Sequence, residues 1–188
     1  MAGKRLNTGD KFPNFTYNTG WEEGKTTDEL FAKADKTVFW VLRYIGCSVC
    51  RLDVEMIRER YSEFQAKGAQ VCVLMQSDQA HIKKEFGEDS AALPFDLICD
   101  NAQEIYQALD IKPAASKLKL LGGISEIGKM KKKADKCKAY GFEHGDYEGN
   151  ELQLPAMFIV GKDGTVEFAH YAKGIVDMPV IDEVLAKL

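Results

Sequence analysis

The sequence has only three histidines and five cysteines among its 188 residues, and its 25 basic side chains are outnumbered by 29 acidic ones. No apolar run is long enough to span a bilayer, and Met1–Arg5 leads into polar residues rather than a signal-peptide stretch. We therefore expect a cytoplasmic protein with no membrane partner. The net charge of −4 argues against nucleic acid as a partner.

The five cysteines lack the even number and the spacing of a disulfide framework, which fits a reducing compartment. No second Cys/His pair has the spacing of a zinc site, and we predict neither a metal nor another cofactor. Hydrophobic residues make up 45% of the chain, enough for one substantial core, so we expect a single domain over residues 1–188.

Two of the cysteines form the motif Cys47-Ser48-Val49-Cys50 at a change of sequence pattern. Residues 37–45 before it are rich in β-branched and aromatic side chains, which predicts a buried strand. After the motif, apolar residues recur every three to five positions as far as Gly68, as on one face of a helix. The motif is therefore expected at the end of a strand and in the first turn of a helix.

This placement favours redox chemistry. Unpaired N–H groups and the dipole at a helix N-terminus stabilise a thiolate and lower its pKa. Two intervening residues let the sulfurs of Cys47 and Cys50 close a small ring, so that one attacks and the other resolves the product. Half of a zinc site, or two inert buried cysteines, would have the same spacing. Because a strand precedes the motif, we take Cys47 and Cys50 as the catalytic candidates.

Strands and helices alternate along the rest of the chain, which is typical of an α/β fold. Thr26 and Glu29 have the spacing of a capping box, and Asp78 and Gly87 mark the two ends of another helix. Further strands are predicted over residues 69–75, 95–99, 156–160 and 165–170. Asp100 or Asn101 is expected to cap a helix that bears Leu109, and Asp177 is expected to cap the last helix.

Residues 113–150 depart from this alternation. We expect an insertion of one or two helices, broken near Gly122-Gly123, over the sheet or near the cysteine motif. The lysine cluster at residues 129–133 is interpreted as a solvated face, with a patch for an anionic substrate or partner as the alternative. Cys137 is interpreted as an exposed or half-buried spare thiol, and Cys72 and Cys99 are interpreted as small buried residues.

Several segments together resemble the AhpC/TSA group of peroxiredoxins. Gly9 to Phe15 are similar to the group's opening Gly-x-x-x-Pro-x-Phe, and Leu93 to Ile111 are similar to its Pro-x-x-x-x-x-Asp segment and following helix. Leu154 to Val160 are similar to the segment in which thioredoxin-fold proteins place a cis-proline opposite the active-site cysteines. The motif and the insertion together are most similar to the CxxC-containing peroxiredoxin-like 2 family.

The resemblance implies a thioredoxin-like fold, a central mixed sheet flanked by helices, with the helical insertion ahead of a cis Pro155 that helps to bind substrate. Peroxiredoxins carry Pro-x-x-x-Thr-x-x-Cys, whose cysteine attacks peroxide. Laid on this chain without gaps, Cys50 takes the attacking position, Cys47 replaces the threonine and Arg43 replaces the proline. Arg43 and Arg51 are the candidates for the arginine that such enzymes place beside the thiolate.

The expected function is therefore that of an oxidoreductase that reduces peroxides through a Cys47–Cys50 disulfide, with an external dithiol such as thioredoxin as reductant. Two orders of attack stay open. In the thioredoxin-like order Cys47 attacks a substrate disulfide and Cys50 resolves the mixed disulfide. In the peroxiredoxin-like order Cys50 attacks the peroxide and then condenses with Cys47. A thiol–disulfide oxidoreductase acting on protein disulfides and a non-catalytic redox sensor or binding module are the alternatives, and a homodimer is left open.

Overall fold

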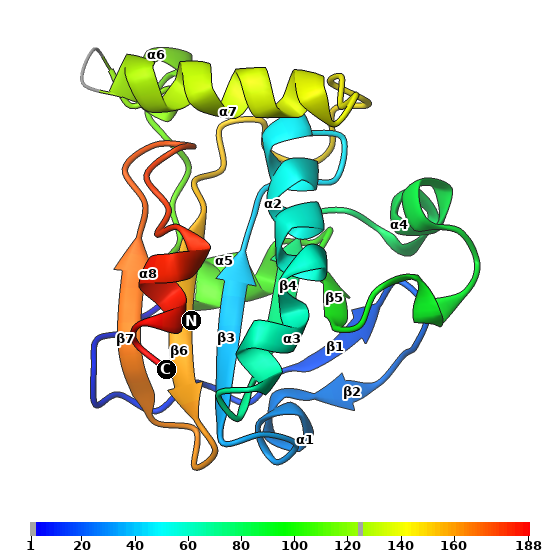
Figure 1. Cartoon of the computed structure of the whole chain (residues 1–188). Helices are drawn as coiled ribbons and strands as arrows, with labels where there is room; N and C mark the ends of the chain where they lie inside the picture. The colour runs from blue at the N-terminus through cyan, green and yellow to red at the C-terminus, as the bar shows by residue number, and fades with distance from the viewer. Residues whose placement is uncertain (1–2, 124–125) are drawn as a thin grey trace.

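The computed structural model describes residues 3–123 and 126–188, and it contains a seven-stranded mixed sheet with strand order β2-β1-β5-β4-β3-β6-β7 (Figure 1). The strands are β1 (Thr16–Thr19), β2 (Lys25–Thr26), β3 (Lys36–Val41), β4 (Ala69–Met75), β5 (Asp96–Cys99), β6 (Ala156–Gly161) and β7 (Val166–Tyr171). The helices are α1 (Thr27–Phe31), α2 (Ser48–Glu59), α3 (Tyr61–Gln65), α4 (Gln79–Phe86), α5 (Glu104–Ala108), α6 (Lys117–Leu120), α7 (Ile127–Ala139) and α8 (Ile181–Leu185), with a short 3-10 turn η1 at Ser90–Ala92.

Strand β3 lies in the middle of the sheet. It pairs with β4 in parallel and with β6 in antiparallel orientation, so that Phe39 has Cys72 on one side and Phe158 on the other. Its apolar β-branched and aromatic side chains suit a strand that is buried on both faces. Because the chain runs from β3 through a short loop to the cysteine motif, the motif lies beyond the carboxyl-terminal end of β3.

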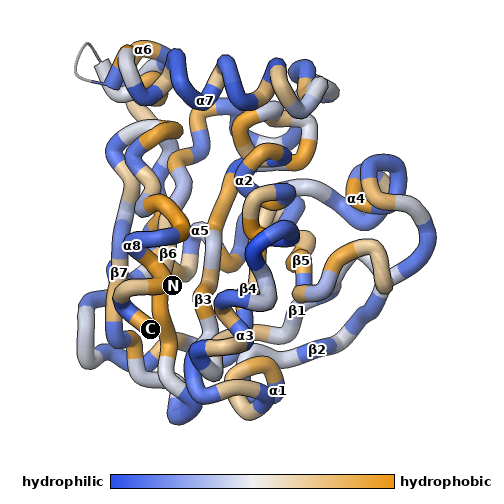
Figure 2. The backbone as a smooth tube through the Cα atoms, viewed as in Figure 1, coloured by the Kyte–Doolittle hydropathy of each residue, from blue (hydrophilic) through white to orange (hydrophobic). Residues whose placement is uncertain are grey.

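The two faces of the sheet carry separate hydrophobic cores. On one face, Trp40, Val73 and Ile159 pack with residues of α2, α3 and α8. On the other face, Phe39 and Leu74 pack with residues of α1 and α5. The alternation of side chains along each central strand thus divides the apolar residues between two layers of helices. Figure 2 shows the hydrophobic central strands and the more hydrophilic α7.

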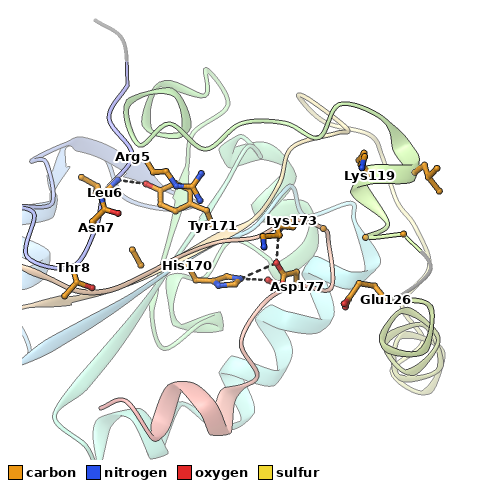
Figure 3. A pocket seen from close by; sticks show the side chains of 15 residues that line it. Arg5, Leu6, Asn7, Thr8, Lys119, Glu126, His170, Tyr171, Lys173 and Asp177 are labelled. Atoms are coloured by element: carbon orange, nitrogen blue, oxygen red, sulfur yellow. Dashed lines mark hydrogen bonds and ion pairs between the residues drawn. The ribbon is translucent and has the colours of Figure 1, made fainter.

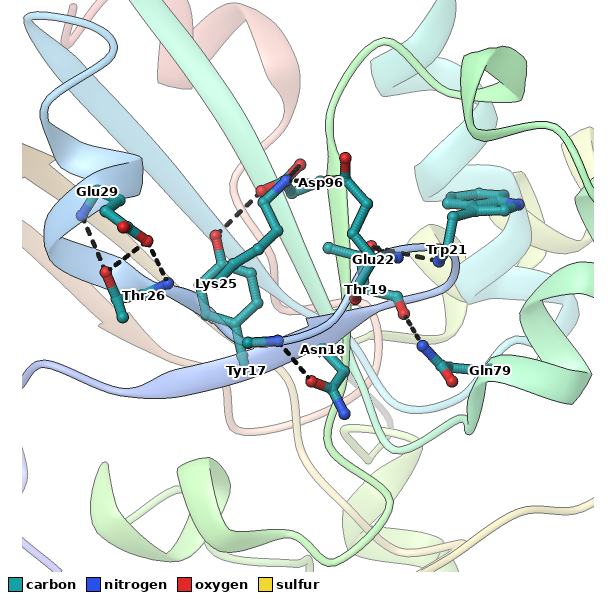
Figure 4. Close-up of polar contacts among 11 residues, drawn as sticks. Tyr17, Asn18, Thr19, Trp21, Glu22, Lys25, Thr26, Glu29, Gln79 and Asp96 are labelled. Atoms are coloured by element: carbon teal, nitrogen blue, oxygen red, sulfur yellow. Dashed lines mark hydrogen bonds and ion pairs between the residues drawn. The ribbon is translucent and has the colours of Figure 1, made fainter.

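The β1–β2 ribbon extends the sheet beyond β5. Lys25 on β2 lies 2.9 Å from a carboxylate oxygen of Asp96, and the Tyr17 hydroxyl donates to the same carboxylate at 3.0 Å (Figure 4). These contacts fasten the ribbon to β5. The capping box predicted at the start of α1 is confirmed, because the Thr26 hydroxyl accepts the Glu29 N–H while the Glu29 carboxylate accepts the Thr26 N–H.

The segment 113–150 contains α6 and α7 and is closed at its base by a bridge between Pro113 and Gln153. Helix α7 crosses the N-terminal end of α2 (Figure 1). Gly122 and Gly123 have φ values of +79° and +72°, so the predicted break between two helices is confirmed. Residues 124 and 125 within the predicted insertion lie outside the described residues. In the described part of the chain no helix is both long and apolar enough to span a bilayer.

Several predicted boundaries differ from the structure. The strand predicted over 37–45 ends at Val41, and the long helix after the motif divides at Arg60, whose φ and ψ of −108° and 13° are not helical. Asp100 caps α5 as predicted, since its carboxylate accepts the backbone N–H groups of Glu104 and Ile105. The helix itself begins only at Glu104, later than that cap predicts, with Gln103 as the N-cap residue. Helix α8 begins at Ile181 rather than beside Asp177.

Candidate active site

The cysteine motif lies at the junction predicted from the sequence. Cys47 is the N-cap residue of α2, with an extended backbone at φ −76° and ψ 114°, and Cys50 lies in the first turn. Both are buried, each with 2% of its surface exposed. The residues that replace the expected end of the strand, 42–46, form a buried loop from β3 to α2. This loop determines what surrounds the two sulfurs.

The loop is held by hydrogen bonds from two distant segments. The Ile45 N–H donates to the Ser77 hydroxyl at 2.8 Å, and the Gly46 N–H donates to the buried Glu148 carboxylate at 3.2 Å. The Gly46 carbonyl accepts the Gly145 N–H at 2.7 Å. A Cβ atom at residue 46 would lie 1.9 Å from the Asp146 carbonyl oxygen, so the close approach of the two backbones requires glycine.

The surroundings of Cys47 favour its thiolate. Its pKa is lowered to about 6, first because the Cys50 thiol donates a hydrogen bond to it. The positive charge of Arg43 and the N–H groups of Cys50 and Val49 act in the same direction, and burial opposes them. At neutral pH Cys47 is therefore mostly a thiolate, the form that attacks peroxides and disulfides.

Cys50 has the opposite shift. Burial raises its pKa first, and its hydrogen bond to Cys47 and the negative charge there raise it further. The two sulfurs thus divide the roles of thiolate and thiol between them. Both cysteines are free thiols in this structure.

Arg43 is buried beside Cys47. One of its terminal nitrogens donates to the Cys47 sulfur at 3.4 Å, and the other donates to the Tyr44 hydroxyl at 3.3 Å and to the Glu151 carbonyl. The side chain is fixed from three directions, which places a charge that is always present next to the sulfur.

Arg51, the other candidate arginine, has different contacts. It donates to the Glu85 carboxylate at 3.1 Å and to the Glu143 carbonyl, and its guanidinium lies 5.2 Å from the centre of the Phe142 ring. Arg51 therefore joins α2 to α4 and to the end of the insertion. Among residues 3–123 and 126–188, no hydrogen bond joins it to either sulfur of the motif.

The expectation that Pro155 follows a cis peptide bond is wrong, since the described residues contain no cis peptide. Pro155 is buried directly before β6, whose first residue Ala156 lies opposite Val41. Pro155 is thus near the carboxyl-terminal end of β3, the end from which the chain continues to the cysteine motif. Its carbonyl accepts the Ala172 N–H at 3.1 Å and so belongs to the pairing with β7.

A group of aromatic side chains next to Arg43 had no sequence signal. The Tyr44 hydroxyl lies 3.2 Å from Nε2 of His144, and the His144 ring lies 4.4 Å from that of Tyr147, centre to centre. Together with Arg43 and Leu120 of α6 they line a cavity of about 180 Å³. His144 and Tyr147 follow Tyr44 by about 100 residues, and only the fold of the insertion brings them together.

A buried ion pair lies on the other side of the motif. Lys133 of α7 contacts both oxygens of Asp53 at 2.7 and 2.9 Å, and Asp53 is one helical turn beyond Cys50. Burial acts against the charge of Lys133, but Asp53 and the nearby cysteines raise its pKa overall. One member of the lysine cluster is therefore a packed residue rather than part of a solvated face.

The remaining cysteines differ from the motif. Cys72 is buried in β4, as expected, and burial raises its pKa well above the usual range. Cys99 is half-buried, and its pKa is raised to about 12 for the same reason. The interpretation of Cys137 as an exposed or half-buried thiol is wrong, because the packing of α7 on α2 leaves only 5% of its surface exposed.

No cluster of three or more metal-ligating side chains occurs within the described ranges. A cavity of about 920 Å³ lies elsewhere, between the N-terminal segment and the end of β7 (Figure 3). His170 on its wall has its Nε2 2.5 Å from the Asp177 carbonyl oxygen.

The fold is that of peroxiredoxins. A peroxiredoxin-like protein from Aquifex aeolicus superposes with a TM-score of 0.66 and 18% identity, over 99% of this chain and 88% of that one. Peroxiredoxin 6 of Arenicola marina superposes with a TM-score of 0.69 and 14% identity, over 96% of this chain and 70% of that one. A yeast mitochondrial 1-Cys peroxiredoxin superposes with a TM-score of 0.65 and 13% identity, over 96% of this chain and 73% of that one. That structure addresses thiol resolution through glutathione and thioredoxin systems. A search of curated protein sequences gives no match.

The mixed sheet with helices on both faces is accordingly the thioredoxin-like fold expected from the sequence. The model of the AhpC/TSA family matches residues 8–169, which is most of the chain. The protein belongs to the AhpC/TSA family.

Proposed function

We propose that the protein is a thiol-dependent peroxidase in which Cys47 attacks the peroxide and Cys50 resolves the product. The observation that carries this proposal is the position of the Cys47 sulfur, at the N-cap of α2 with a terminal nitrogen of Arg43 3.4 Å away. The lowered pKa of Cys47 and the raised pKa of Cys50 agree with it. Membership of the AhpC/TSA family supports a peroxide as the substrate.

In the first step the Cys47 thiolate attacks the terminal oxygen of ROOH. The S–O bond forms as the O–O bond breaks, and RO⁻ takes a proton from solvent and leaves as ROH. Cys47 becomes a sulfenic acid, two electrons more oxidised. Arg43 is placed to stabilise both the attacking sulfur and the negative charge that moves onto the peroxide oxygens.

In the second step the sulfur of Cys50 attacks that of Cys47. The S–S bond forms, and the hydroxyl of the sulfenic acid leaves as water with the proton of the Cys50 thiol. Oxidation of Cys47 removes the negative charge that helps to raise the pKa of Cys50, so the resolving thiol becomes easier to deprotonate only after the first step. An external dithiol, such as thioredoxin, then reduces the disulfide and is itself oxidised.

This order differs from the gap-free alignment with the peroxiredoxin motif, which puts the attack on Cys50. The two orders make opposite predictions for single variants. We would measure consumption of hydrogen peroxide and of an organic hydroperoxide with thioredoxin or dithiothreitol, for the parent, Cys47→Ser and Cys50→Ser, with Cys99→Ser as the matched control.

Cys47→Ser should abolish the reaction, while Cys50→Ser should consume one peroxide per chain and accumulate the Cys47 sulfenic acid, which dimedone labelling and mass spectrometry detect. Cys99→Ser should behave as the parent. A first turnover that survives in Cys47→Ser and disappears in Cys50→Ser would reverse the assignment. Inertness toward both peroxides, with reduction of insulin disulfides that needs Cys47, would replace the peroxidase by a thiol–disulfide oxidoreductase.

A further inference from the structure

A second cavity lies between α2, α7 and α8, and both apolar and polar side chains line it. Its volume is about 340 Å³, at the lower end of the range for small-molecule sites. Leu52 and Met56 of α2 and Val176, Met178 and Ile181 beside α8 line its apolar part. It shares no lining residue with the cavity beside Arg43, so the two cavities are separate. Figure 1 shows α7 above the N-terminal end of α2, with α8 alongside.

Trp40 of β3 supplies a hydrogen-bond donor without an acceptor. The side chain lines the cavity and is 3% exposed, and its indole Nε1 has no partner in the described part of the chain. A buried donor left without a partner costs roughly 1–3 kcal/mol, and most such groups in proteins are paired. A ligand oxygen in the cavity would pair this donor.

The cavity wall formed by α7 is cationic. Four of its lysines border the cavity, namely Lys129, Lys132, Lys133 and Lys136. Lys133 pairs with Asp53 and Lys129 with Glu126, but within residues 3–123 and 126–188 no carboxylate lies within ion-pair distance of Lys132 or Lys136. The acidic groups on the cavity are Asp53, already paired, and Glu183, which accepts the Val180 N–H at 3.1 Å.

We propose that this cavity binds an aliphatic carboxylate, with the chain against the apolar residues of α2 and α8 and the carboxylate held by Lys132, Lys136 and the Trp40 indole N–H. A neutral apolar molecule would leave the two ammonium groups and the indole donor unused. A small inorganic anion would leave the apolar wall exposed to water. An amphiphile with one anionic end satisfies both sides of the cavity.

The site does not depend on the peroxidase chemistry. Its residues lie outside the cavity beside Arg43, so Cys47→Ser should bind the carboxylate as the parent does. Loss of peroxidase activity in that variant and loss of binding in the variants below are separate results.

The test uses decanoate as the probe and decanol as its uncharged counterpart, with affinities measured by isothermal titration calorimetry on the full chain. Lys132→Ala/Lys136→Ala should weaken decanoate binding about fivefold or more and leave decanol unchanged, since two exposed ion pairs are lost. Trp40→Phe should weaken decanoate about tenfold because a hydrogen bond to a charged group is lost. Lys131→Ala/Lys138→Ala removes two lysines of α7 that do not line the cavity, and it should bind as the parent does.

Binding of decanoate that is tighter than that of decanol, and weakened by both the lysine pair and Trp40→Phe, supports the proposal. The absence of decanoate binding overturns it, and so does binding that either variant leaves unchanged. Equal affinity for decanol and decanoate would mean an apolar cavity with no anion site, and an equal loss in the Lys131/Lys138 control would mean unspecific attraction to the charge of α7. Circular dichroism and thermal unfolding establish that each variant is folded.

Discussion

Cys47 and Cys72 are buried to the same degree, at 2% and 0% exposure, yet their pKa values shift in opposite directions. Cys72 lies inside β4, where the backbone N–H groups are used by the sheet and burial dominates. Cys47 lies where a helix begins, so unpaired N–H groups, the Cys50 thiol and Arg43 all face its sulfur. Donors, and not exposure, determine which of these buried cysteines is reactive.

The same comparison explains why the loop 42–46 matters. Burial is a property of the core, which tolerates many arrangements, whereas donors act only at hydrogen-bond distance. The loop fixes these distances through the Ser77 hydroxyl and the Glu148 carboxylate, which come from after β4 and from the end of the insertion. The end of the insertion thus helps to hold the loop that carries Arg43, the residue whose guanidinium lies beside the Cys47 sulfur.

The largest expected effect is on the thiolate itself. Absorbance at 240 nm against pH should show one step in the parent near pH 6, because Cys47 is a thiolate above its lowered pKa and gains a proton as the pH falls through it. Cys47→Ser should remove this step. Cys72→Ser should retain it, since the raised pKa of Cys72 keeps that thiol protonated throughout. A step retained in Cys47→Ser would show that donors around Cys47 do not lower its pKa.

The next effect concerns the guanidinium. Arg43→Met should raise the pKa of Cys47 by about 1 to 3 units, because an opposite charge at close range is removed. The rate of peroxide reduction should then reach its half-maximum at a correspondingly higher pH. Arg51→Met removes the same charge from α2, where Arg51 pairs with Glu85, and it should leave the midpoint unchanged. Equal shifts in both variants would mean that the net charge, and not the position of Arg43, controls the thiolate.

The third effect is structural. Gly46→Ala would place a Cβ atom 1.9 Å from the Asp146 carbonyl oxygen and force the insertion away from the loop. We expect a loss of about 2 kcal/mol in the free energy of unfolding, measured with urea, and a rise in the pKa of Cys47. Gly128→Ala on α7 is the matched control, because a Cβ there meets no heavy atom within 4 Å and alanine favours helices. If both variants are equally stable, the loop tolerates displacement of the insertion.

Much of the fold was predictable because its signals are local. Strand β4 was predicted to the residue, and α4 is capped by Asp78 and Gly87 as predicted, because a cap and a glycine at φ +89° act on their own neighbours. The position of Cys47 at the start of α2 follows from the same kind of signal. Asp100 shows the limit, since its carboxylate caps α5 from four residues before the first helical residue, Glu104, so the cap does not mark where the helix begins.

The surroundings of Cys47 were less predictable because they depend on contacts between distant segments. Arg43 was named as a candidate, but its choice over Arg51 depends on which way each side chain points. His144 and Glu148 approach the loop only after the insertion folds back, about 100 residues along the chain. Cys137 was misjudged because its burial depends on how α7 packs on α2. None of these contacts has a periodicity or a motif in the sequence.

The smallest expected effect tests how far the donor network extends from the sulfur. Tyr44→Phe removes the hydroxyl that accepts from Arg43 at 3.3 Å and faces His144 at 3.2 Å. Because Arg43 keeps its bonds to the Glu151 carbonyl and to Cys47, we expect the pKa of Cys47 to rise by less than about 0.5 unit, the indirect effect of one hydrogen bond. The measurement is again the absorbance step, compared with that of His144→Gln.

A rise as large as that in Arg43→Met would mean that the Tyr44 hydroxyl, and not the carbonyl of Glu151, holds the guanidinium against the sulfur. His144→Gln would then share the effect only if the imidazole in turn fixes the hydroxyl. No effect in either variant would confine the donors that act on Cys47 to its own helix terminus, the Cys50 thiol and Arg43. The pKa of Cys47 would then depend only on the groups in direct contact with its sulfur, whereas the loop 42–46 that positions these groups depends on contacts with distant segments.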